Sequence, residues 1–242
     1  MKTVAIIQAR MSSTRLPGKV MRMLEDRTVV GHVITRCLAI PSVDEIVIAT
    51  TDQEEDIVVV DEAERYGVSC YRGSLDNVLD RYYRAAVNAR ADVVVRITSD
   101  CPLLDPRVSD RVITHFLQHK FDYSSSGQSS TFPRGLDTEV FTFNALKTAH
   151  EKASHDYEYE HVTPYLYMHP DEFNTFGYRN TEDCSKYRLT LDTLEDWELI
   201  SAIYKELYKG QIFYWEEVKS LLLAQPELAL INSHIVQKKL GE

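Results

Sequence analysis

The chain has 242 residues, of which 44% are hydrophobic and 26% charged, and its formal net charge is −10. This length allows one domain, or one domain with a lobed extension, with enough apolar side chains for a core. A broad nucleic-acid or anionic-membrane surface needs summed positive potential, so the negative charge argues against both kinds of partner.

The cysteines and the start of the chain favour a cytoplasmic protein. The four cysteines are widely spaced. They do not form the CxxC pattern of a structural zinc site, and they are too few and too far apart for a disulfide framework. The apolar run at 4–7 is too short for the hydrophobic part of a signal peptide or for a membrane span. A reducing cytoplasm fits these features.

The first half of the chain alternates short β-branched runs with segments of helical spacing, in which apolar residues recur every three or four positions. Strands are predicted at 3–7, 45–49, 68–71 and 92–97, and helices at 29–39, 54–66, 77–88 and 107–119. Strands that are apolar on both faces and alternate with helices indicate an α/β fold, with a mostly parallel central sheet flanked by helices. In such folds, ligands bind beyond the carboxyl ends of the strands.

The second half gives a less regular pattern. Residues 121–137 include the polar stretch SSSGQSS without periodicity, which predicts a flexible loop or a lid. Strands are then expected at 139–143 and 187–191, helices at 144–152, 194–208 and 215–223, and a tail at 226–242 that docking alone would order. There is no internal repeat, so we expect one domain over residues 1–242, with about 121–185 as a loop or arm.

A concentration of cations follows the first predicted strand. Residues 8–19 read QARMSSTRLPGK and carry Arg10, Arg15, Lys19, three hydroxyl groups and a Pro-Gly turn. A triphosphate needs such donors, because cations and fixed dipoles have to offset its charge. The turn lets backbone N–H groups face the phosphates and aims Lys19 at them. The segment is neither a Walker loop nor a GxGxxG fingerprint, and a solvated basic turn is the alternative interpretation.

Two aspartates follow predicted strands and are candidate ligands of Mg²⁺. Asp100 comes after the strand at 92–97, where a carboxylate can hold Mg²⁺ against phosphate oxygens. Capping the next helix is its alternative role, but Asp105, followed by Pro106, fits that role better. Asp192 follows the strand predicted at 187–191, and for it metal binding and helix capping both stay open.

Three further side chains are candidates for contact with a second substrate. Asp137 and Glu139 would share one face of a strand, which could turn both toward a cleft. His161 lies in the aromatic stretch EYEHVTPYLY, where a ligand contact and a buried structural role both stay open. The other histidines form no convincing metal cluster. The sequence also has no GxSxG motif and no cysteine beside a base, so nucleophilic catalysis is not favoured.

These segments together resemble a known family. IIQARMSSTRLPGKVM resembles the N-terminal signature of the cytidylyltransferases that activate acidic sugars, of the acylneuraminate and 3-deoxy-manno-octulosonate types. TSDCPLLDP is similar to their metal-binding segment, and LTLDTLEDWELI to a later segment. Within that superfamily, FPRGLDTEVF and EYEHVTPYLY are most similar to the branch of spore coat polysaccharide biosynthesis protein F. The similarity extends from Lys2 to about residue 205.

The resemblance implies a nucleotide-diphospho-sugar transferase (Rossmann-like) fold with a small dimerisation arm, a homodimer, CTP as substrate and Mg²⁺ as cofactor. By position, Asp100 and Asp192 would bind Mg²⁺, and Arg15, Lys19 and Asp100 would be the catalytic residues. Asp137 and Glu139 would face the acceptor, a side to which we also assign His161. The nucleotide would be bound by Gln8, Ala9, Arg10, Arg15, Lys19, Thr51, Asp52, Asn77 and Arg81.

The expected reaction is attack by an acceptor oxygen on the α-phosphorus of CTP, with release of pyrophosphate, in surface or spore polysaccharide biosynthesis. Arg15, Lys19 and Mg²⁺ would offset the charge that develops. A nucleotide-sugar-dependent glycosyltransferase of the same fold is one alternative, although such enzymes usually carry a DxD motif and SDCP has one acid. A non-catalytic nucleotide-binding subunit, which would bind CTP without releasing pyrophosphate, is the other.

Overall fold

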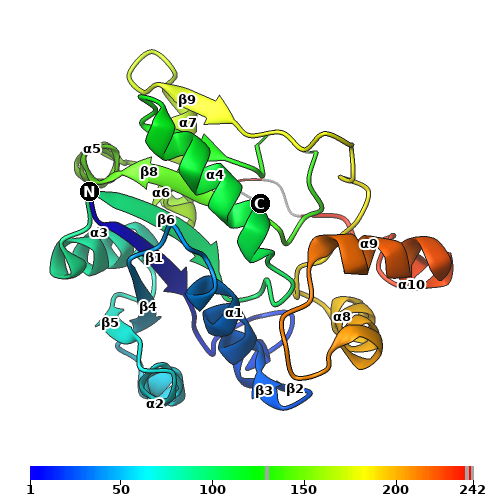
Figure 1. Ribbon diagram of the computed structural model, residues 1–242. Coiled ribbons are helices and arrows are strands. Elements are labelled where there is room, and N and C mark those ends of the chain that lie inside the picture. The colour runs from blue at the N-terminus through cyan, green and yellow to red at the C-terminus, as the bar shows by residue number, and fades with distance from the viewer. Residues whose placement is uncertain (129–130, 238–239, 241–242) are drawn as a thin grey trace.

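A central sheet organises the protein. The computed structural model describes residues 1–128, 131–237 and 240, and its seven-stranded sheet has the order β5-β4-β1-β6-β8-β7-β9 (Figure 1). Strand β8 is antiparallel to β6 and β7, and the other neighbouring pairs are parallel, which confirms the mostly parallel sheet. The strands are β1 (Thr3–Gln8), β4 (Glu45–Thr51), β5 (Ser69–Gly73), β6 (Val93–Thr98), β7 (Tyr123–Ser125), β8 (Glu139–Thr142) and β9 (Thr175–Gly177).

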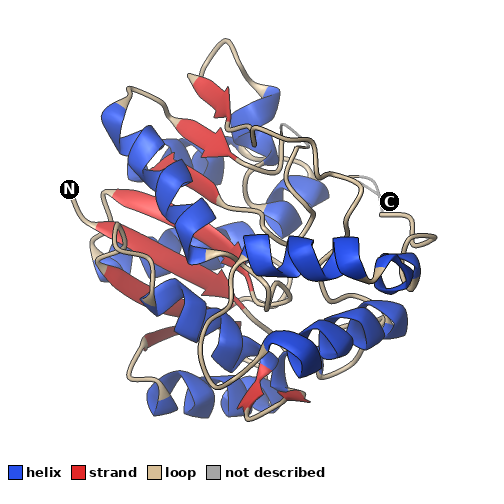
Figure 2. Ribbon diagram, turned by 45° about the vertical axis from the view of Figure 1, so that its right-hand side comes forward, coloured by secondary structure: helices blue, strands red, loops and turns tan. Residues whose placement is uncertain are grey.

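Helices cover both faces of this sheet (Figures 1 and 2). The apolar side chains of β1 alternate between the faces, with Ala5 and Ile7 in one core cluster and Val4 and Ile6 in the other. One face packs against α1 (Val29–Leu38), α2 (Ile57–Arg65) and α4 (Pro106–Gln118). The other packs against α3 (Val78–Ala89), α5 (Phe143–Lys152), α6 (Asp156–His161) and α7 (Pro164–Met168).

A third core cluster lies beside the sheet and contains the C-terminal helices. These are α8 (Leu194–Leu207), α9 (Trp215–Ala224) and α10 (Pro226–Leu230), coloured orange to red in Figure 1. The hydroxyl of Tyr204 donates to the carbonyl of Pro102 over 2.6 Å, and the backbone N–H of Trp215 donates to Asp105 over 2.6 Å. These buried bonds attach the helical group to the segment that follows β6.

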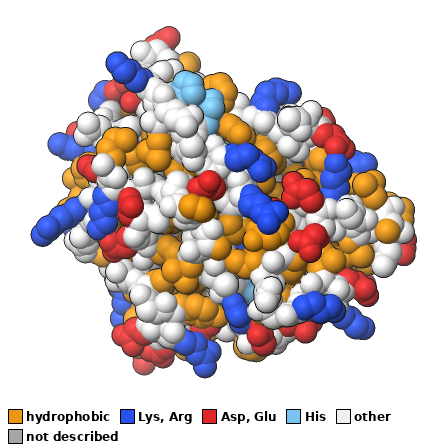
Figure 3. Space-filling view, in the orientation of Figure 1, with side chains coloured by type: hydrophobic (Ala, Val, Ile, Leu, Met, Phe, Trp, Pro, Cys, Tyr) orange, Lys and Arg blue, Asp and Glu red, His pale blue; other side chains and the backbone are white. Residues whose placement is uncertain are grey.

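Short elements connect these layers. The 3₁₀ helices η1 (Lys19–Met21) and η2 (Glu54–Asp56) follow β1 and β4, and the hairpin of β2 (Met23–Leu24) and β3 (Arg27–Thr28) precedes α1. No helix in the described part of the chain is both long and apolar enough to span a membrane. On the face in Figure 3, Lys and Arg side chains are scattered among Asp and Glu.

Every strand and helix predicted for the first half is present. The strand bounds differ from the predicted ones by a residue or two, and the helix predicted at 54–66 starts as η2 before α2 begins at Ile57. Asp105 caps α4 as predicted, since its Oδ1 accepts from the backbone N–H of Arg107 over 2.7 Å. The strand at 139–143 and the helices at 144–152, 194–208 and 215–223 are also confirmed, as β8, α5, α8 and α9.

Two predictions for the second half are wrong. Residues 121–137 contain β7, a buried strand whose hydroxyl-rich sequence concealed it: Ser124 and Ser125 are no more than 2% exposed, and Ser126 Oγ accepts from the N–H of Thr138 over 2.9 Å. Residues 129–130 of that segment and 238–239 and 241–242 of the predicted tail lie outside the described residues. The stretch 187–191 is extended but forms a single bridge, Arg134 to Arg188, because it runs beside a loop rather than beside the sheet.

That bridge depends on a glycine. Gly135 has φ +103°, and an added Cβ would lie 2.5 Å from the carbonyl carbon and oxygen of Leu189. Two backbone hydrogen bonds join the segments beside this contact. The N–H of Arg134 donates to the carbonyl of Tyr187, and the N–H of Leu189 donates to the carbonyl of Arg134. The close approach therefore sets the path of the chain toward Asp192.

We predict that Gly135→Ala lowers the free energy of unfolding by about 3 kcal/mol or more, because strain and a backbone clash add together. Gly67→Ala is the matched control: Gly67 has φ +66° but no atom within 4 Å of an added Cβ, and the cost should be about 1 kcal/mol. Urea unfolding of both variants measures the difference. Equal losses of unfolding free energy in the two variants would mean that the close contact between Gly135 and Leu189 adds nothing to stability.

Candidate active site

The ammonium group of Lys19 lies between two carboxylates from distant parts of the chain. Its Nζ is 2.9 Å from Asp100 Oδ2 and 2.9 Å from Asp192 Oδ1, and it also donates to the carbonyl of Leu191 over 2.7 Å. An ammonium has three donors, and all three are used. The Lys19 side chain is 11% exposed, so this bridge lies largely out of solvent.

The loop after β1 brings Lys19 to this position. The carbonyl of Met11 accepts from the N–H groups of Ser13 and Gly18, over 2.9 and 3.1 Å, which folds the loop back on itself. Gly18, with φ 65°, then starts the 3₁₀ turn that contains Lys19. The loop is fixed from outside by Asp56, whose Oδ1 accepts from the N–H of Met11 over 2.6 Å. Asp56 was missed in the sequence, because nothing marked it as a partner of the loop.

Asp100 and Asp192 can pair with Lys19 because neighbouring residues cap the two helices that follow them. Asp105, and not Asp100, caps α4. Thr193 caps α8 through its hydroxyl, which accepts from the N–H of Asp196, so Asp192 is not the cap. Asp192 Oδ2 instead lies 3.1 Å from Arg15 Nη2 and 3.1 Å from Arg188 Nη2. The structure thus brings Arg15 and Asp192 together with Lys19 and Asp100, beside the carboxyl ends of β1 and β6.

Electrostatics keep the bridge charged. Burial opposes ionisation of Asp100, but the charge of Lys19 and hydrogen bonds from Thr98, Lys19 and Cys101 together outweigh burial and lower the pKa of that carboxyl to about 2. Burial likewise opposes the charge on Lys19, yet Asp100 and Asp192 raise the pKa of the ammonium above 10.5. Asp100 therefore contributes stability above its ordinary pKa of 3.8 that is lost as the pH falls toward 2, and Lys19 contributes stability that is lost above pH 10.5.

The two carboxylates suit Mg²⁺. Carboxylate oxygens are the protein ligands that Mg²⁺ prefers, and the Lys19 ammonium shows that the pair accepts a cation between its oxygens. Among the described residues, no group of three or more His, Cys, Asp or Glu side chains is placed to hold a metal. Two acids are enough when substrate oxygens and water complete the shell.

The predicted nucleotide residues border the adjacent part of the site. Gln8 ends β1, and its Oε1 is buried without a hydrogen-bond partner among the described residues. Next to it, the N–H of Ala9 donates to Ala49 over 3.2 Å. Arg10 and Arg81 come together, since an Nη1 of each lies 3.4 Å from the carbonyl of Leu75. Arg81 is 1% exposed, and burial followed by repulsion from Arg10 lowers its pKa.

The other three residues predicted to bind the nucleotide differ in whether their side chains are buried and hydrogen-bonded within the protein. The Thr51 hydroxyl is buried and donates to Asp56, which links β4 to the cationic loop. Asn77 caps α3, with its Oδ1 accepting from the N–H of Asp80 over 2.8 Å. Asp52 is exposed and accepts from Gln53 over 2.9 Å. The side chains of Thr51 and Asn77 are thus engaged inside the protein.

The acceptor candidates lie further along the sheet. Asp137 precedes β8 rather than lying within a strand with Glu139, and its Oδ2 accepts from the N–H of Gly135 over 2.9 Å. Burial raises the pKa of Asp137, and Glu139 and Asp100 add to the effect. Glu139 is bound by Arg96, Tyr123 and Thr163, so its carboxylate is occupied. His161 ends α6, where burial lowers its pKa.

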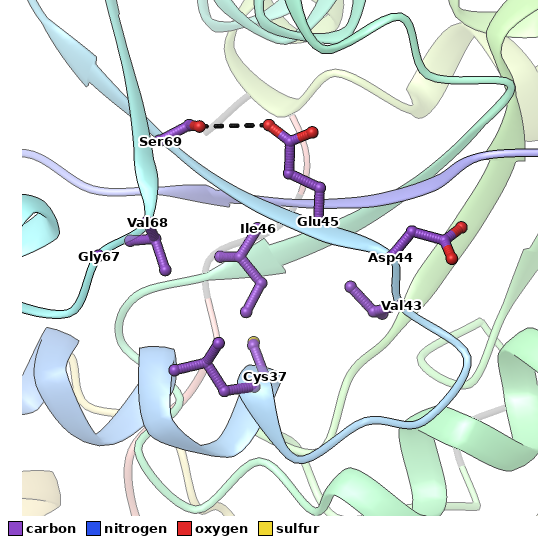
Figure 4. Close-up of a pocket in the computed structure, with 9 residues that line it drawn as sticks. Cys37, Val43, Asp44, Glu45, Ile46, Gly67, Val68 and Ser69 are labelled. Carbon is purple, nitrogen blue, oxygen red and sulfur yellow. Dashed lines mark hydrogen bonds between the residues drawn. The ribbon is translucent and has the colours of Figure 1, made fainter.

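A surface pocket elsewhere does not suit a nucleotide. It lies at the start of β4, the end of the sheet opposite the site, where Ser69 and Glu45 are 3.2 Å apart (Figure 4). Its charged lining residues are Asp44 and Glu45, and no Lys or Arg is among the residues that line it. Acidic walls repel phosphate groups.

Comparison with known proteins decides between the candidate classes. The family model described as "Cytidylyltransferase" matches residues 4–224. The chain belongs to the cytidylyltransferase family. It is therefore a nucleotidyltransferase, as the sequence motifs predicted, and the glycosyltransferase alternative is not supported.

Individual relatives agree with this family. An uncharacterised protein of Methanocaldococcus jannaschii is 37% identical, in a match that covers 100% of this chain and 99% of the relative. The spore coat polysaccharide biosynthesis protein SpsF of Bacillus subtilis is 33% identical over 93% of this chain and 95% of its own. A solved cytidylyltransferase from Leptospira borgpetersenii serovar Hardjo-bovis superposes with a TM-score of 0.90 at 32% identity, covering 99% and 100% of the two chains. The predicted fold and the predicted SpsF branch are confirmed.

The bridge predicts a pH-dependent change in stability. Lys19→Met leaves two neighbouring carboxylates without their shared cation, which should lower the free energy of unfolding near pH 7 by about 1–3 kcal/mol. The loss should shrink below about pH 5, because the pKa of Asp100 rises when Lys19 is removed and a proton then replaces the cation.

Urea unfolding at several pH values between 4 and 8 measures this loss. Lys219→Met is the control, because Lys219 pairs with Glu182 on the surface. The free energy of unfolding that this variant loses should not shrink below about pH 5. A loss in Lys19→Met that is the same at pH 4 and pH 8 would contradict the bridge.

Proposed function

We propose that this cytidylyltransferase transfers CMP from CTP to an oxygen of a sugar acid or related sugar-like acceptor, releases pyrophosphate and requires Mg²⁺. The observation that carries the proposal is the Lys19 ammonium between Asp100 and Asp192, with Arg15 on the same aspartate. Similarity to SpsF supports a place in surface or spore polysaccharide biosynthesis.

The reaction forms one phosphorus–oxygen bond and breaks another. The acceptor oxygen attacks the α-phosphorus of CTP, and the bond from that phosphorus to the bridging oxygen of the β-phosphate breaks, so pyrophosphate leaves with the electron pair. A hydroxyl acceptor must also lose its proton. Asp137 is suited to take it, because burial raises its pKa and makes the carboxylate a stronger base.

Arg15 and Lys19 would bind the phosphates. Phosphate oxygens are anionic acceptors, so Lys19 can exchange a carboxylate for one of them and keep its donors filled. Fixed cations of this kind stabilise the charge that develops during transfer more than solvent does. Asp100 and Asp192 would hold Mg²⁺, which when bound withdraws charge from the phosphate oxygens.

The nucleotide would lie against the ends of β1 and β4. The buried Oε1 of Gln8 has no hydrogen-bond partner among the described residues, which suits the amino group of cytosine, and Arg10 and Arg81 supply positive charge nearby. Because the side chains of Thr51 and Asn77 are engaged inside the protein, they would act through backbone groups or by shaping the site. Asp52, at the exposed end of β4, would contact the ribose.

Two further parts of the proposal concern the surroundings of the protein. We expect a homodimer, in which residues within 121–185 form the arm, and we expect the protein to work in the cytoplasm.

A sugar acid is the preferred acceptor class because the sequence resembles the cytidylyltransferases that activate acidic sugars. On the acceptor side, Glu139 is already neutralised by Arg96.

The proposal predicts that Lys19→Ala and Asp100→Ala each slow pyrophosphate release from CTP by about 100-fold or more, since the first removes a cation from the reacting phosphates and the second removes a proposed ligand of Mg²⁺. The assay measures pyrophosphate across a panel of sugar acids with Mg²⁺. Lys152→Ala is the control: Lys152 pairs with Glu172 on the surface, so its rate should match the unmodified protein. Full release by both site variants would contradict the proposal.

A further inference from the structure

A second network holds Asp192 from the side of Arg188. While Asp192 Oδ1 contacts Lys19, its Oδ2 contacts Arg188 Nη2 at 3.1 Å. Arg188 in turn forms a two-point pair with Asp196, Nε to Oδ1 at 2.8 Å and Nη2 to Oδ2 at 2.9 Å. A paired geometry of this kind fixes the plane of the guanidinium. The position of the Asp192 carboxylate therefore depends on the Arg188–Asp196 pair.

Asp196 also fixes the backbone that carries Asp192. Its Oδ2 accepts from the N–H groups of Asp192 and Thr193, over 2.9 and 3.0 Å. The side chain of Asp196 is fully buried. Such a carboxylate needs several donors to offset its desolvation, so loss of any one donor disturbs the rest of the network.

One of these donors comes from beyond the last helix. Asn232 is 2% exposed, and its Nδ2 donates to Asp196 Oδ1 over 2.8 Å and to the carbonyl of Arg188 over 3.0 Å. Gln237 adds an acceptor for Arg188 Nη1 at 2.7 Å. The family model ends at residue 224, so both side chains lie outside the part of the chain that it matches.

We propose that Asn232 is a positioning residue for the nucleotidyl-transfer site. Its amide holds Asp196 and Arg188 in place, and these two hold Asp192 in the orientation in which its carboxylate receives a cation. The C-terminal segment thus takes part in the active site without touching the substrate. The catalytic consequence rests on the proposed function, whereas the ordering of residues 188–196 does not.

The test replaces Asn232 with aspartate, which has nearly the same shape but no amide donors and adds a negative charge beside Asp196. Asn174→Asp is the matched control, because Asn174 Nδ2 also donates to a backbone carbonyl, that of Lys120 at 2.6 Å, on an exposed part of the chain. Hydrogen exchange, read by mass spectrometry on peptides covering 188–196, follows the amides of Asp192 and Thr193 without any ligand. The Mg²⁺ concentration that gives half-maximal pyrophosphate release is the second readout.

Asn232→Asp should speed exchange of those amides and raise the half-maximal Mg²⁺ concentration by about tenfold or more, as removal of partners behind a metal ligand commonly does. Asn174→Asp should change neither. Unchanged exchange at 188–196 overturns the proposal, and so does faster exchange with an unchanged Mg²⁺ requirement, since Asn232 would then be merely structural. A native protein that releases no pyrophosphate would contradict the proposed function, and hydrogen exchange alone would then decide whether Asn232 orders this segment.

Discussion

One ammonium group bridges two carboxylates, and much of the surrounding structure brings these three charges together. Lys19 reaches the edge of the sheet through a loop closed by Met11 and fixed by Asp56. Asp100 arrives by a different route, directly from β6, which lies next to β1 in the sheet. Burying three charges is costly unless each is paired and hydrogen-bonded. Here every donor of the ammonium has an acceptor, so the cluster persists without substrate and already resembles a cation site.

Asp192 shows how a side chain of the candidate site can be positioned without regular secondary structure. The stretch before it is extended but has one bridge, held by the close approach at Gly135. The stretch after it is the start of α8, where Thr193 takes the capping role and Asp196 binds the backbone. The third core cluster supports both sides, through Leu189 and Leu191 before Asp192 and Ile200 after it. Core packing and capping thus place a side chain whose partner Lys19 is 173 residues away in the chain.

The sequence was sufficient for the parts of the fold that depend on local pattern. Apolar runs on β1 and β6 predicted strands because their residues pack on both faces, and parallel strand ends predicted where Lys19 and Asp100 would meet. It was insufficient where tertiary contacts override composition. The serines of β7 are polar in sequence but buried in the sheet, and the stretch at 187–191 packs into the third core cluster without joining the sheet. Asp56, Arg188 and Asn232 were missed because their roles depend on long-range contacts that leave no periodic signal.

The most direct test of the central claim is a crystal structure with CTP, an unreactive acceptor analogue and Mn²⁺ in place of Mg²⁺, with the metal located by its anomalous scattering. We expect Mn²⁺ to be bound by Asp100 and Asp192, and Lys19 to have moved from between them onto a phosphate oxygen. A metal peak away from both carboxylates, with Lys19 still joining them, would contradict the claim that this bridge is the resting form of the active site.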